Sequence, residues 1–153
     1  MMSQFTDKVV IVTGAGTGIG QQVARDFVNA GAKVAFIGRR IEKLQDAAKD
    51  LPDKMVMLCS CDVSDRDAVN STAESIISAW GTVDILVNNA GINTNPRSVG
   101  EVAPSGWDRV LNINLTGTFN VIRTVLPRMR EQQDGIIVNI ASTAGLRAGK
   151  LAG

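Results

Sequence analysis

The sequence predicts an α/β fold built on a doubly wound parallel sheet. Short runs rich in β-branched residues alternate with segments of helical period, the connections between them are short, and the 153 residues are enough for one domain, 1–153. Four strand–helix units are followed by a fifth strand. Because crossovers between parallel strands are right-handed, we expect the strand order 3-2-1-4-5, with a binding crevice at the carboxyl ends of the first and fourth strands.

The first strand is predicted over residues 8–13 (KVVIVT), whose unbroken apolar character is typical of a parallel strand covered on both faces. A glycine-rich turn follows at residues 14–20. A helix then runs from Gly20, and its apolar face consists of Val23, Phe27 and Ala30. Gly31 is expected to end this helix, because glycine readily adopts the left-handed conformation that closes helices.

The second strand is predicted over residues 33–37 and the third over residues 55–61. The helix between them is stopped by Pro52, and its apolar face is Ile41, Leu44, Ala48 and Leu51. Cys59 and Cys61 lie two apart, so they point to the same face, at a separation near the upper limit for a disulfide. No histidine or further cysteine completes a metal site, so we expect buried free thiols and no metal.

Ser64 is predicted to cap the third helix, with Asp65 and Asp67 in its positive first turn. Gly81 ends this helix, and its apolar face is Val69, Ala73, Ile76, Ile77 and Trp80. The fourth strand is predicted over residues 84–87, followed by a polar loop over residues 88–104 that could supply one wall of a substrate site. A long helix over residues 105–130 has a weak point at residues 114–117, and residues 135–141 form the fifth strand.

Charge and composition exclude several functions. Sixteen Lys and Arg against fifteen Asp and Glu leave a net charge of +1, so the chain lacks the basic surface that nucleic-acid binding requires. No apolar run approaches the roughly 18 residues of a membrane span, and the first run is too short for a signal-peptide core, so we expect no membrane contact and a cytoplasmic protein. The absence of histidine excludes Ser-His and Cys-His nucleophile pairs and the HExxH zinc site.

The glycine-rich turn reads TGAGTGIG over residues 13–20. It follows a strand and opens a helix, which is the context that a dinucleotide-binding turn needs. Glycines allow a sharp turn and a close approach to a pyrophosphate, and the helix N-terminus offers free N–H groups and a positive dipole end. The alternative is simply a tight strand-to-helix turn, but such a turn requires one or two glycines rather than four within seven residues.

Five segments together resemble the short-chain dehydrogenase/reductase family, and the resemblance covers essentially the whole chain. They are residues 13–20 (TGAGTGIG), 62–63 (DV), 88–91 (NNAG), 114–117 (NLTG) and 138–142 (VNIAS). The resemblance implies a Rossmann-type sheet and an oxidoreductase that transfers a hydride between a nicotinamide cofactor and a small alcohol or carbonyl substrate. It also implies that the intact parent protein is a homo-oligomer.

By this resemblance, the glycine turn would hold the pyrophosphate and nearby ribose, while Asp62 would accept a hydrogen bond from the adenine amino group beside Val63. The alternative interpretation of Asp62 is a loop aspartate near a helix start. The 88–91 segment would let the chain pass close to the cofactor and tie neighbouring strands together. The implied cofactor-binding residues are Gly14, Thr17, Gly18, Ile19, Gly20, Arg39, Arg40, Asp62, Val63, Asn89, Ala90 and Gly91.

The end of the second strand favours NADP(H) over NAD(H). NAD-selective sites place an acid about 20 residues beyond the glycines to hold the ribose 2′-OH. Here the position carries Arg39 and Arg40, two guanidiniums suited to a 2′-phosphate. The alternative is a solvated pair of arginines at a helix start, with Glu42 as an ionic partner.

Ser142 and Asn114 match the catalytic serine and asparagine of the family. Ser142 would donate a hydrogen bond to the substrate oxygen, and it is no nucleophile because no histidine activates it. Asn114 would mark a helix irregularity, consistent with a π-bulge, where a backbone carbonyl can hold a water in a proton relay. Taken alone, Asn114 would be an ordinary polar residue of a helix.

The acid/base residue of the family is a tyrosine in a YxxxK motif just downstream of the serine, and the sequence contains no tyrosine. We expect that the domain is incomplete at its C-terminal end and that residues 1–153 alone are inactive. The alternatives are a natural non-catalytic nucleotide-binding fragment and a divergent enzyme that uses another acid. An incomplete domain would leave the fifth strand as a bare edge and expose Val125, Leu126 and Met129.

Overall fold

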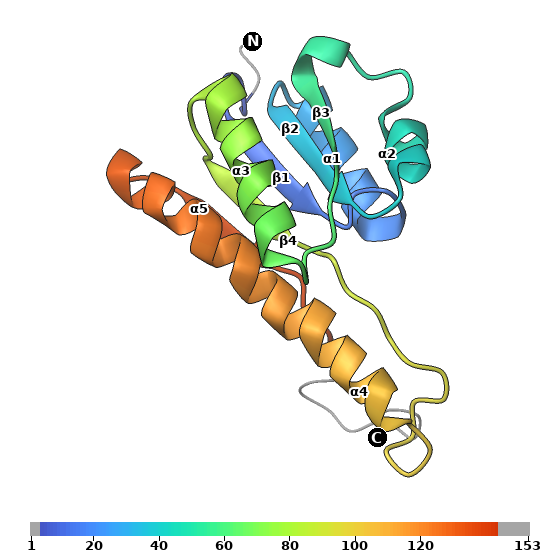
Figure 1. Cartoon of the computed structure of the whole chain (residues 1–153). Coiled ribbons are helices and arrows are strands. Elements are labelled where there is room, and N and C mark those ends of the chain that lie inside the picture. The colour runs from blue at the N-terminus through green and yellow to red at the C-terminus, as the bar shows by residue number, and fades with distance from the viewer. Residues whose placement is uncertain (1–3, 144–153) are drawn as a thin grey trace.

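The computed structural model describes residues 4–143 and contains a five-stranded parallel sheet in the order β3-β2-β1-β4-β5, which confirms the predicted topology (Figure 1). The strands are β1 (Val9–Thr13), β2 (Lys33–Gly38), β3 (Val56–Ser60), β4 (Ile85–Asn88) and β5 (Ile136–Asn139). The helices are α1 (Gly18–Asn29), α2 (Ile41–Ala48), α3 (Arg66–Trp80), α4 (Pro104–Leu111) and α5 (Thr118–Gln132), with a 3₁₀ turn at Asp53–Met55 and a π-helical segment at Asn112–Gly117. Each strand and α-helix lies within a few residues of its predicted position, with α4 and α5 together in place of the one predicted long helix.

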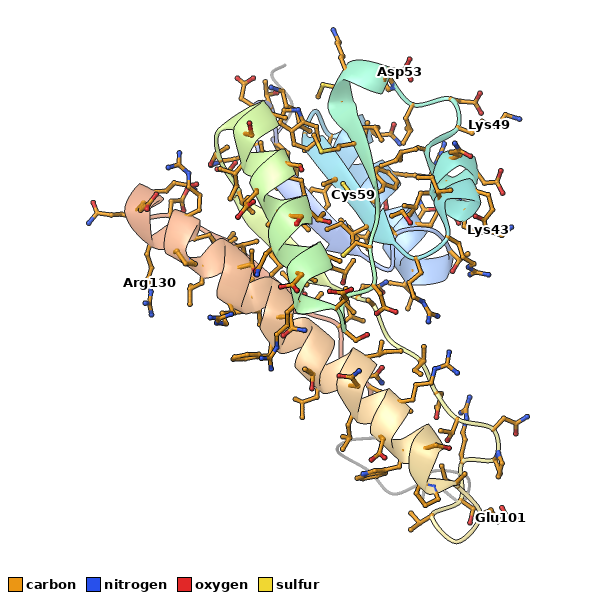
Figure 2. All side chains as sticks on the ribbon, viewed as in Figure 1. Lys43, Lys49, Asp53, Cys59, Glu101 and Arg130 are labelled. Carbon is orange, nitrogen blue, oxygen red and sulfur yellow. The ribbon has the colours of Figure 1, made fainter. Side chains whose placement is uncertain are left out.

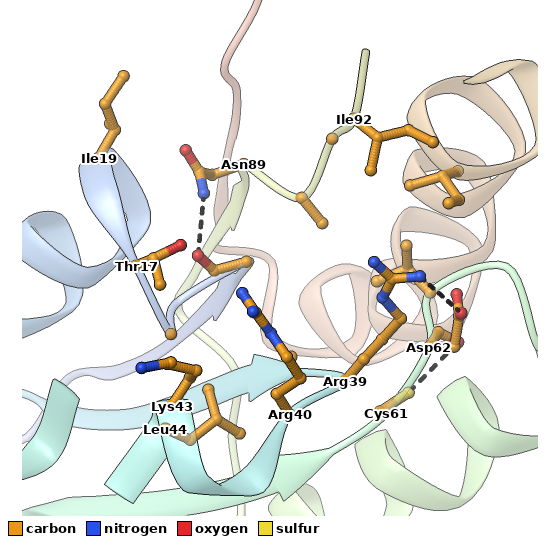
Figure 3. A pocket seen from close by; sticks show the side chains of 17 residues that line it. Thr17, Ile19, Arg39, Arg40, Lys43, Leu44, Cys61, Asp62, Asn89 and Ile92 are labelled. Carbon is orange, nitrogen blue, oxygen red and sulfur yellow. Dashed lines mark hydrogen bonds and ion pairs between the residues drawn. The ribbon is translucent and has the colours of Figure 1, made fainter. Parts of the chain in front are cut away.

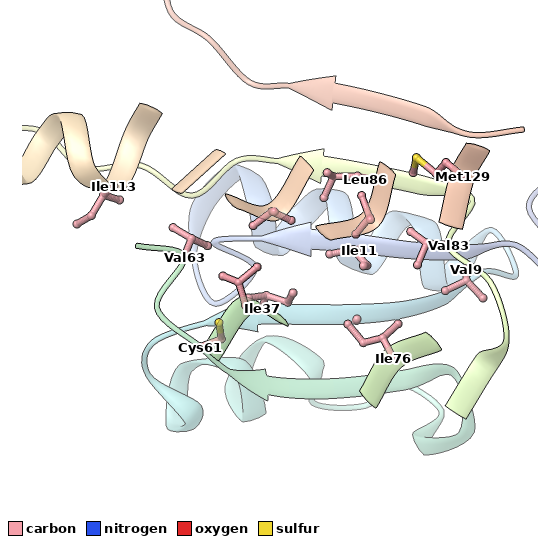
Figure 4. Close-up of a cluster of buried hydrophobic side chains, with 14 residues drawn as sticks. Val9, Ile11, Ile37, Cys61, Val63, Ile76, Val83, Leu86, Ile113 and Met129 are labelled. Carbon is pink, nitrogen blue, oxygen red and sulfur yellow. The ribbon is translucent and has the colours of Figure 1, made fainter. Parts of the chain in front are cut away.

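The central strands β1, β2 and β4 are buried on both faces, because their side chains point alternately to opposite sides and helices cover both sides. Val10 and Val12 of β1 pack with α1 and α2, whereas Val9 and Ile11 pack with α3 and α5. Figure 4 shows the second of these clusters, in which side chains from both helices lie against the sheet. All five residues of β1 are buried, which explains why its sequence reads as one apolar run.

Helix α3 corrects the predicted cap. Asp65, not Ser64, is the N-cap residue, and its carboxylate accepts hydrogen bonds from the backbone N–H groups of Asp67 and Ala68 at 3.0 Å each. Ser64 lies one position outside the helix, where its hydroxyl donates to Asp62 Oδ1 at 2.7 Å. The neighbouring cap candidates are both short polar residues, so the sequence alone does not separate them.

The long helix is interrupted where the sequence predicts a weak point. Between α4 and α5 the backbone forms the π-helical segment Asn112–Gly117. Gly117 is required there because a β-carbon at this position would lie 2.5 Å from Val63 Cγ2. The α4 end of this helix extends beyond the sheet (Figure 1).

The expected exposure of apolar residues on α5 is largely wrong. Val125 and Met129 are buried and Leu126 is half-buried, because α5 packs its inner face against α3 and the sheet. Most of the exposed large apolar side chains lie instead on β5 and along the helix formed by α4, the π-helical segment and α5. They are Ile136, Val138 and Ile140 in and after β5, and Trp107, Leu111, Leu115 and Phe119 on the helix, while Ile19, Ile41 and Val99 are exposed elsewhere.

The amino ends of three strands are joined through Asp84. Its carboxylate accepts a hydrogen bond from the Val9 backbone N–H at 2.8 Å and pairs with Lys8 Nζ at 3.0 Å, and Lys8 also reaches Asp134 at 3.4 Å. The hydrogen bond from Lys8 to Asp84 raises the pKa of the lysine above its ordinary value. Asp84 itself is only 12% exposed, so the bond to Val9 is shielded from water.

We expect Asp84→Ala to destabilise the fold by about 2 kcal/mol, because it leaves the buried Val9 N–H without an acceptor. Lys8→Met should cost less than about 1 kcal/mol, because the lysine is half-exposed and its ion pairs are weakened by solvent. Urea unfolding followed by circular dichroism measures both changes. Equal costs for the two substitutions would show that the ion pair, rather than the hydrogen bond to the backbone, dominates at this corner.

Within residues 4–143, no helix is long and apolar enough to cross a membrane. The same part of the chain contains no cluster of three or more histidine, cysteine, aspartate or glutamate side chains that could hold a metal ion.

Candidate functional site

A cleft of about 330 Å³ lies at the carboxyl ends of β1, β2, β3 and β4 (Figure 3). This is the edge at which parallel α/β sheets bind ligands, because the strand order reverses between β1 and β4. Ten of the proposed cofactor-binding residues line it: Gly14, Thr17, Ile19, Arg39, Arg40, Asp62, Val63, Asn89, Ala90 and Gly91. Gly18, Gly20, Asn114 and Ser142 are not part of its lining.

The glycine turn forms one wall of the cleft. Gly14 and Gly18 have φ angles of +67° and +59°, which L side chains rarely adopt. Helix α1 begins at Gly18, and the side chain of its N-cap residue Thr17 forms no capping hydrogen bond. Its first turn contains no acidic residue, so the unpaired N–H groups and the positive end of the helix dipole remain available to an anion.

Asn89 fastens the turn to β4. Its side-chain amide donates to the carbonyl oxygens of Thr13 and Gly14 at 3.0 and 3.3 Å, while the Thr13 hydroxyl oxygen accepts from the backbone N–H groups of Asn89 and Ala90 at 3.0 Å each. Asn88 joins the next strand, because its amide donates to Asn139 Oδ1 at 2.9 Å. The 88–91 segment therefore holds β1, β4 and β5 in register beside the cleft.

The opposite wall carries positive charge from the start of α2. Arg39, Arg40 and Lys43 all line the cleft, and Figure 3 shows Arg39 turned toward Asp62 while Arg40 and Lys43 lie nearer the glycine turn. The Arg39 guanidinium is 3.9 Å from the Asp62 carboxylate, and both side chains are more than a third exposed. This contact is therefore weak enough to be exchanged for a bound anion.

Asp62 is held as a carboxylate. Partial burial acts to raise its pKa, but hydrogen bonds from Ser64 and the positive charges of Arg39 and Arg109 outweigh burial, so the pKa lies below its ordinary value. Ser64 donates to Asp62 Oδ1 from both its hydroxyl and its backbone N–H. Asp62 is therefore an ionised hydrogen-bond acceptor at the end of the cleft throughout the neutral pH range.

The two cysteines are free thiols that face the α3–α5 side of the sheet. Burial raises the pKa of Cys59 to about 11 and also raises the pKa of Cys61. Both thiols therefore keep their protons at neutral pH, where the thiolate would be the reactive form.

Asn114 and Ser142 lie outside the cleft lining, but Asn114 contacts one of the residues that line it. The Asn114 side chain forms a pair of hydrogen bonds with the backbone of Ile92, accepting from its N–H and donating to its carbonyl oxygen at 2.9 Å each. The π-helical segment thus anchors the chain just after β4. Ser142 is exposed beyond the end of β5, which continues the sheet next to β4.

Several cleft residues were missed by the sequence argument: Gly16, Gly38, Lys43, Leu44, Cys61, Ile92 and Ile113. Lys43 could have been found, because it follows Arg39 and Arg40 by one helical turn and therefore faces the same side. Ile113 could not, because it reaches the cleft only through the docking of the π-helical segment.

A parallel Rossmann-type sheet with a glycine turn and a basic second wall is typical of nucleotide-binding α/β domains. Residues 8–152 match the family described as short chain dehydrogenase, and the chain belongs to this family.

Two relatives are similar in sequence over most of the chain. An uncharacterized oxidoreductase of Staphylococcus aureus strain MW2 is 35% identical over 149 residues, which are 97% of this chain and 64% of the relative. The NADP-dependent 3-hydroxy acid dehydrogenase of Shigella flexneri is 37% identical over 137 residues, 90% of this chain and 55% of the relative. The chain thus spans less than two thirds of the length of these relatives.

Two solved structures with bound cofactor share the fold. The closed form of serine dehydrogenase complexed with NADP⁺ superposes with a TM-score of 0.87 at 36% identity, covering 94% of this chain and 57% of that one. The 3-ketoacyl-(acyl-carrier-protein) reductase from Brucella melitensis complexed with NADH has a TM-score of 0.90 at 33% identity, covering 95% of this chain and 62% of that one.

Proposed function

We propose that this chain is the cofactor-binding part of an NADP(H)-dependent oxidoreductase that acts on an alcohol or carbonyl substrate. The observation that carries the proposal is a single cleft with an anion-accepting helix N-terminus on one wall and Arg39 and Arg40 on the other. Among the similar proteins, one is named NADP-dependent and another was solved with NADP⁺, although a third was solved with NADH. Arg39 and Arg40 favour NADP(H), because their guanidinium groups suit a 2′-phosphate that NAD(H) lacks.

The residues of the cleft fit a dinucleotide. A β-carbon added at Gly18 would meet no atom within 4 Å, so no other part of the described chain covers the first residue of α1 on that side. Uncapped N–H groups suit a pyrophosphate, guanidiniums suit a 2′-phosphate, and the ionised Asp62 suits an adenine amino group. A bound nicotinamide would supply or accept the hydride.

The two remaining proposed residues would act near the reacting atoms. Ser142 would donate a hydrogen bond to the substrate oxygen. The Asn114 carbonyl accepts a hydrogen bond from the Thr118 hydroxyl at 2.8 Å, and its second lone pair leaves it able to hold a water molecule. The Asn114 side chain is a positioning group, since it fixes the Ile92 backbone at the edge of the cleft.

We expect the chain to bind NADPH more tightly than NADH, and Arg39→Ala to reduce this preference about tenfold or more. A guanidinium–phosphate contact contributes roughly 1.5–3 kcal/mol, and NADH has no 2′-phosphate to lose. Fluorescence or calorimetric titration with both cofactors measures the ratio of dissociation constants.

Lys54→Ala is the matched control, because it removes one positive charge from the exposed 3₁₀ turn at the amino end of β3, opposite the cleft. It should leave the preference unchanged. A wild-type preference for NADH, or an Arg39→Ala variant with undiminished discrimination, would contradict the cofactor assignment.

The second candidate function is a non-catalytic nucleotide-binding module. It is favoured by one observation, namely that the 153 residues contain neither tyrosine nor histidine. Both candidates require the cleft to bind nucleotide, and only the oxidoreductase requires Ser142 beside a substrate. Because residues 1–153 are expected to be inactive in either case, the two are separated by the turnover of a chain extended through a YxxxK segment, which only the oxidoreductase predicts.

A further inference from the structure

Lys43 is a third cation of the basic wall, and neither the sequence argument nor the proposed function gives it a role. It lies in the first turn of α2, one helical turn after Arg39 and Arg40, and it lines the same cleft. Figure 2 shows it on the side of α2 that faces the cleft end of the sheet, whereas Lys49 lies at the far end of this helix.

The stem of Lys43 packs against the glycine turn. A β-carbon placed on Gly16 would lie 3.1 Å from Lys43 Cβ, so the lysine backbone and the turn are in close approach. Figure 3 shows the side chain beside Thr17, with its nitrogen pointing away from Arg40. The base of the side chain is thereby held beside the turn, and its ammonium group lies near Asp46 one turn further along α2.

The ammonium group has a weak partner in this structure. Lys43 Nζ is 3.5 Å from Asp46 Oδ2, and the two side chains are 44% and 71% exposed. An exposed pair of this kind contributes little to stability. A cation in the first turn of a helix is also disfavoured by the positive end of the helix dipole, so a bound anion would relieve a real repulsion.

We propose that Lys43 binds the 2′-phosphate of the cofactor together with Arg39 and Arg40, and is therefore a further determinant of cofactor specificity. This inference rests on the proposed function, because it assumes that the cleft holds the adenosine end of NADP(H). Three cations line this cleft, while Arg39 is partly engaged by Asp62 at 3.9 Å. Asp62 partly neutralises the positive charge of Arg39, and Lys43 supplies a further positive charge at the cleft.

The test compares Lys43→Met, Lys43→Arg, Asp46→Asn and Lys49→Met with the wild type. Methionine keeps the stem that packs on Gly16 and removes only the charge, and Lys49→Met removes an equal charge outside the cleft. Dissociation constants are measured for NADPH, NADH, adenosine 2′,5′-bisphosphate and adenosine 5′-phosphate, with thermal unfolding as a check on folding.

We expect Lys43→Met to weaken NADPH and the 2′,5′-bisphosphate about threefold to tenfold while NADH and the 5′-phosphate change less than about twofold. Lys43→Arg should bind all four ligands as the wild type does, Asp46→Asn should leave binding equal or slightly tighter, and Lys49→Met should match the wild type.

Equal weakening of all four ligands would overturn the assignment to the 2′-phosphate. If Arg39→Ala abolishes the preference but Lys43→Met leaves it intact, the inference about Lys43 fails and the proposed function stands. If the wild type binds neither cofactor, the proposed function fails and the inference fails with it.

Discussion

Gly20→Ala is expected to destabilise the chain by about 3 kcal/mol, which is a large part of the stability of a domain of this size. Gly20 lies inside α1, where alanine is ordinarily the better helix former by roughly 0.5–1 kcal/mol. Here a β-carbon would contact Asn89 Nδ2 and would lie 2.5 Å from the Gly14 carbonyl oxygen. Neither group can move easily, because the Asn89 amide is bound to the turn at both Thr13 and Gly14.

The measurement is urea unfolding of Gly20→Ala beside Gln22→Ala, an exposed position in the same helix whose amide donates to Asp26. The control should change the unfolding free energy by less than about 0.5 kcal/mol. If Gly20→Ala unfolds at the same urea concentration as the wild type, the close packing of the turn against Asn89 is not essential. The cleft wall would then tolerate side chains at this position.

The sheet could be predicted from the sequence because its central strands carry their own signal. Residues 9–12 and 34–37 are apolar on both faces, which only a strand covered on two sides requires, and the periodic helices between them fix parallel pairing. The end of the second helix differs from the prediction. The helix after Ile41 ends at Ala48 rather than at Pro52, because the chain leaves the helix at Lys49 and Asp50 takes a φ of +65°.

The burial of α5 shows what the sequence could not settle. The expectation that Val125 and Met129 would be exposed rested on missing neighbours, but these residues face α3 and the sheet, whose side chains cover them fully. Periodicity identifies an apolar face but not which neighbour covers it. The exposed side chains of β5 at Ile136 and Val138 belong to a strand that, within residues 4–143, has one neighbour in the sheet.

The candidate site also contains features that the sequence predicts and contacts that it does not. The glycine turn and the two arginines were found because turn chemistry and charge at a strand end are local properties of the sequence. The contact of Lys43 with Gly16 and the hydrogen bonds of Asn114 to Ile92 depend on how separate elements dock. Such contacts have no signal in a single sequence beyond the presence of the residue itself.

The 153-residue chain is expected to bind NADPH without transferring hydride to a carbonyl at a rate normal for an enzyme. Reduction of a carbonyl builds negative charge on its oxygen, and a proton must arrive as this charge develops. A missing general acid costs roughly 10²–10⁴ in rate. The chain contains no tyrosine and no histidine, and Ser142 can donate a hydrogen bond but does not release its proton at neutral pH.

The other protons near the cleft are equally unsuitable. The pKa of Asp62 lies below its ordinary value, so this carboxyl has already lost its proton at neutral pH, and burial raises the pKa of Cys61, so this thiol retains its proton. Because the low pKa of Asp62 moves its protonation further into acid, lowering the pH from 8 to 5 should bring no rise in rate.

The assay follows NADPH oxidation with a panel of ketones and aldehydes across this range, on protein of confirmed mass, with binding titrated on the same sample. A short-chain dehydrogenase that carries the YxxxK segment serves as the positive control. Turnover at roughly 1 s⁻¹ or faster would show that a side chain within these 153 residues is the acid, and a rate that rises toward pH 5 would identify Asp62 as the first residue to substitute.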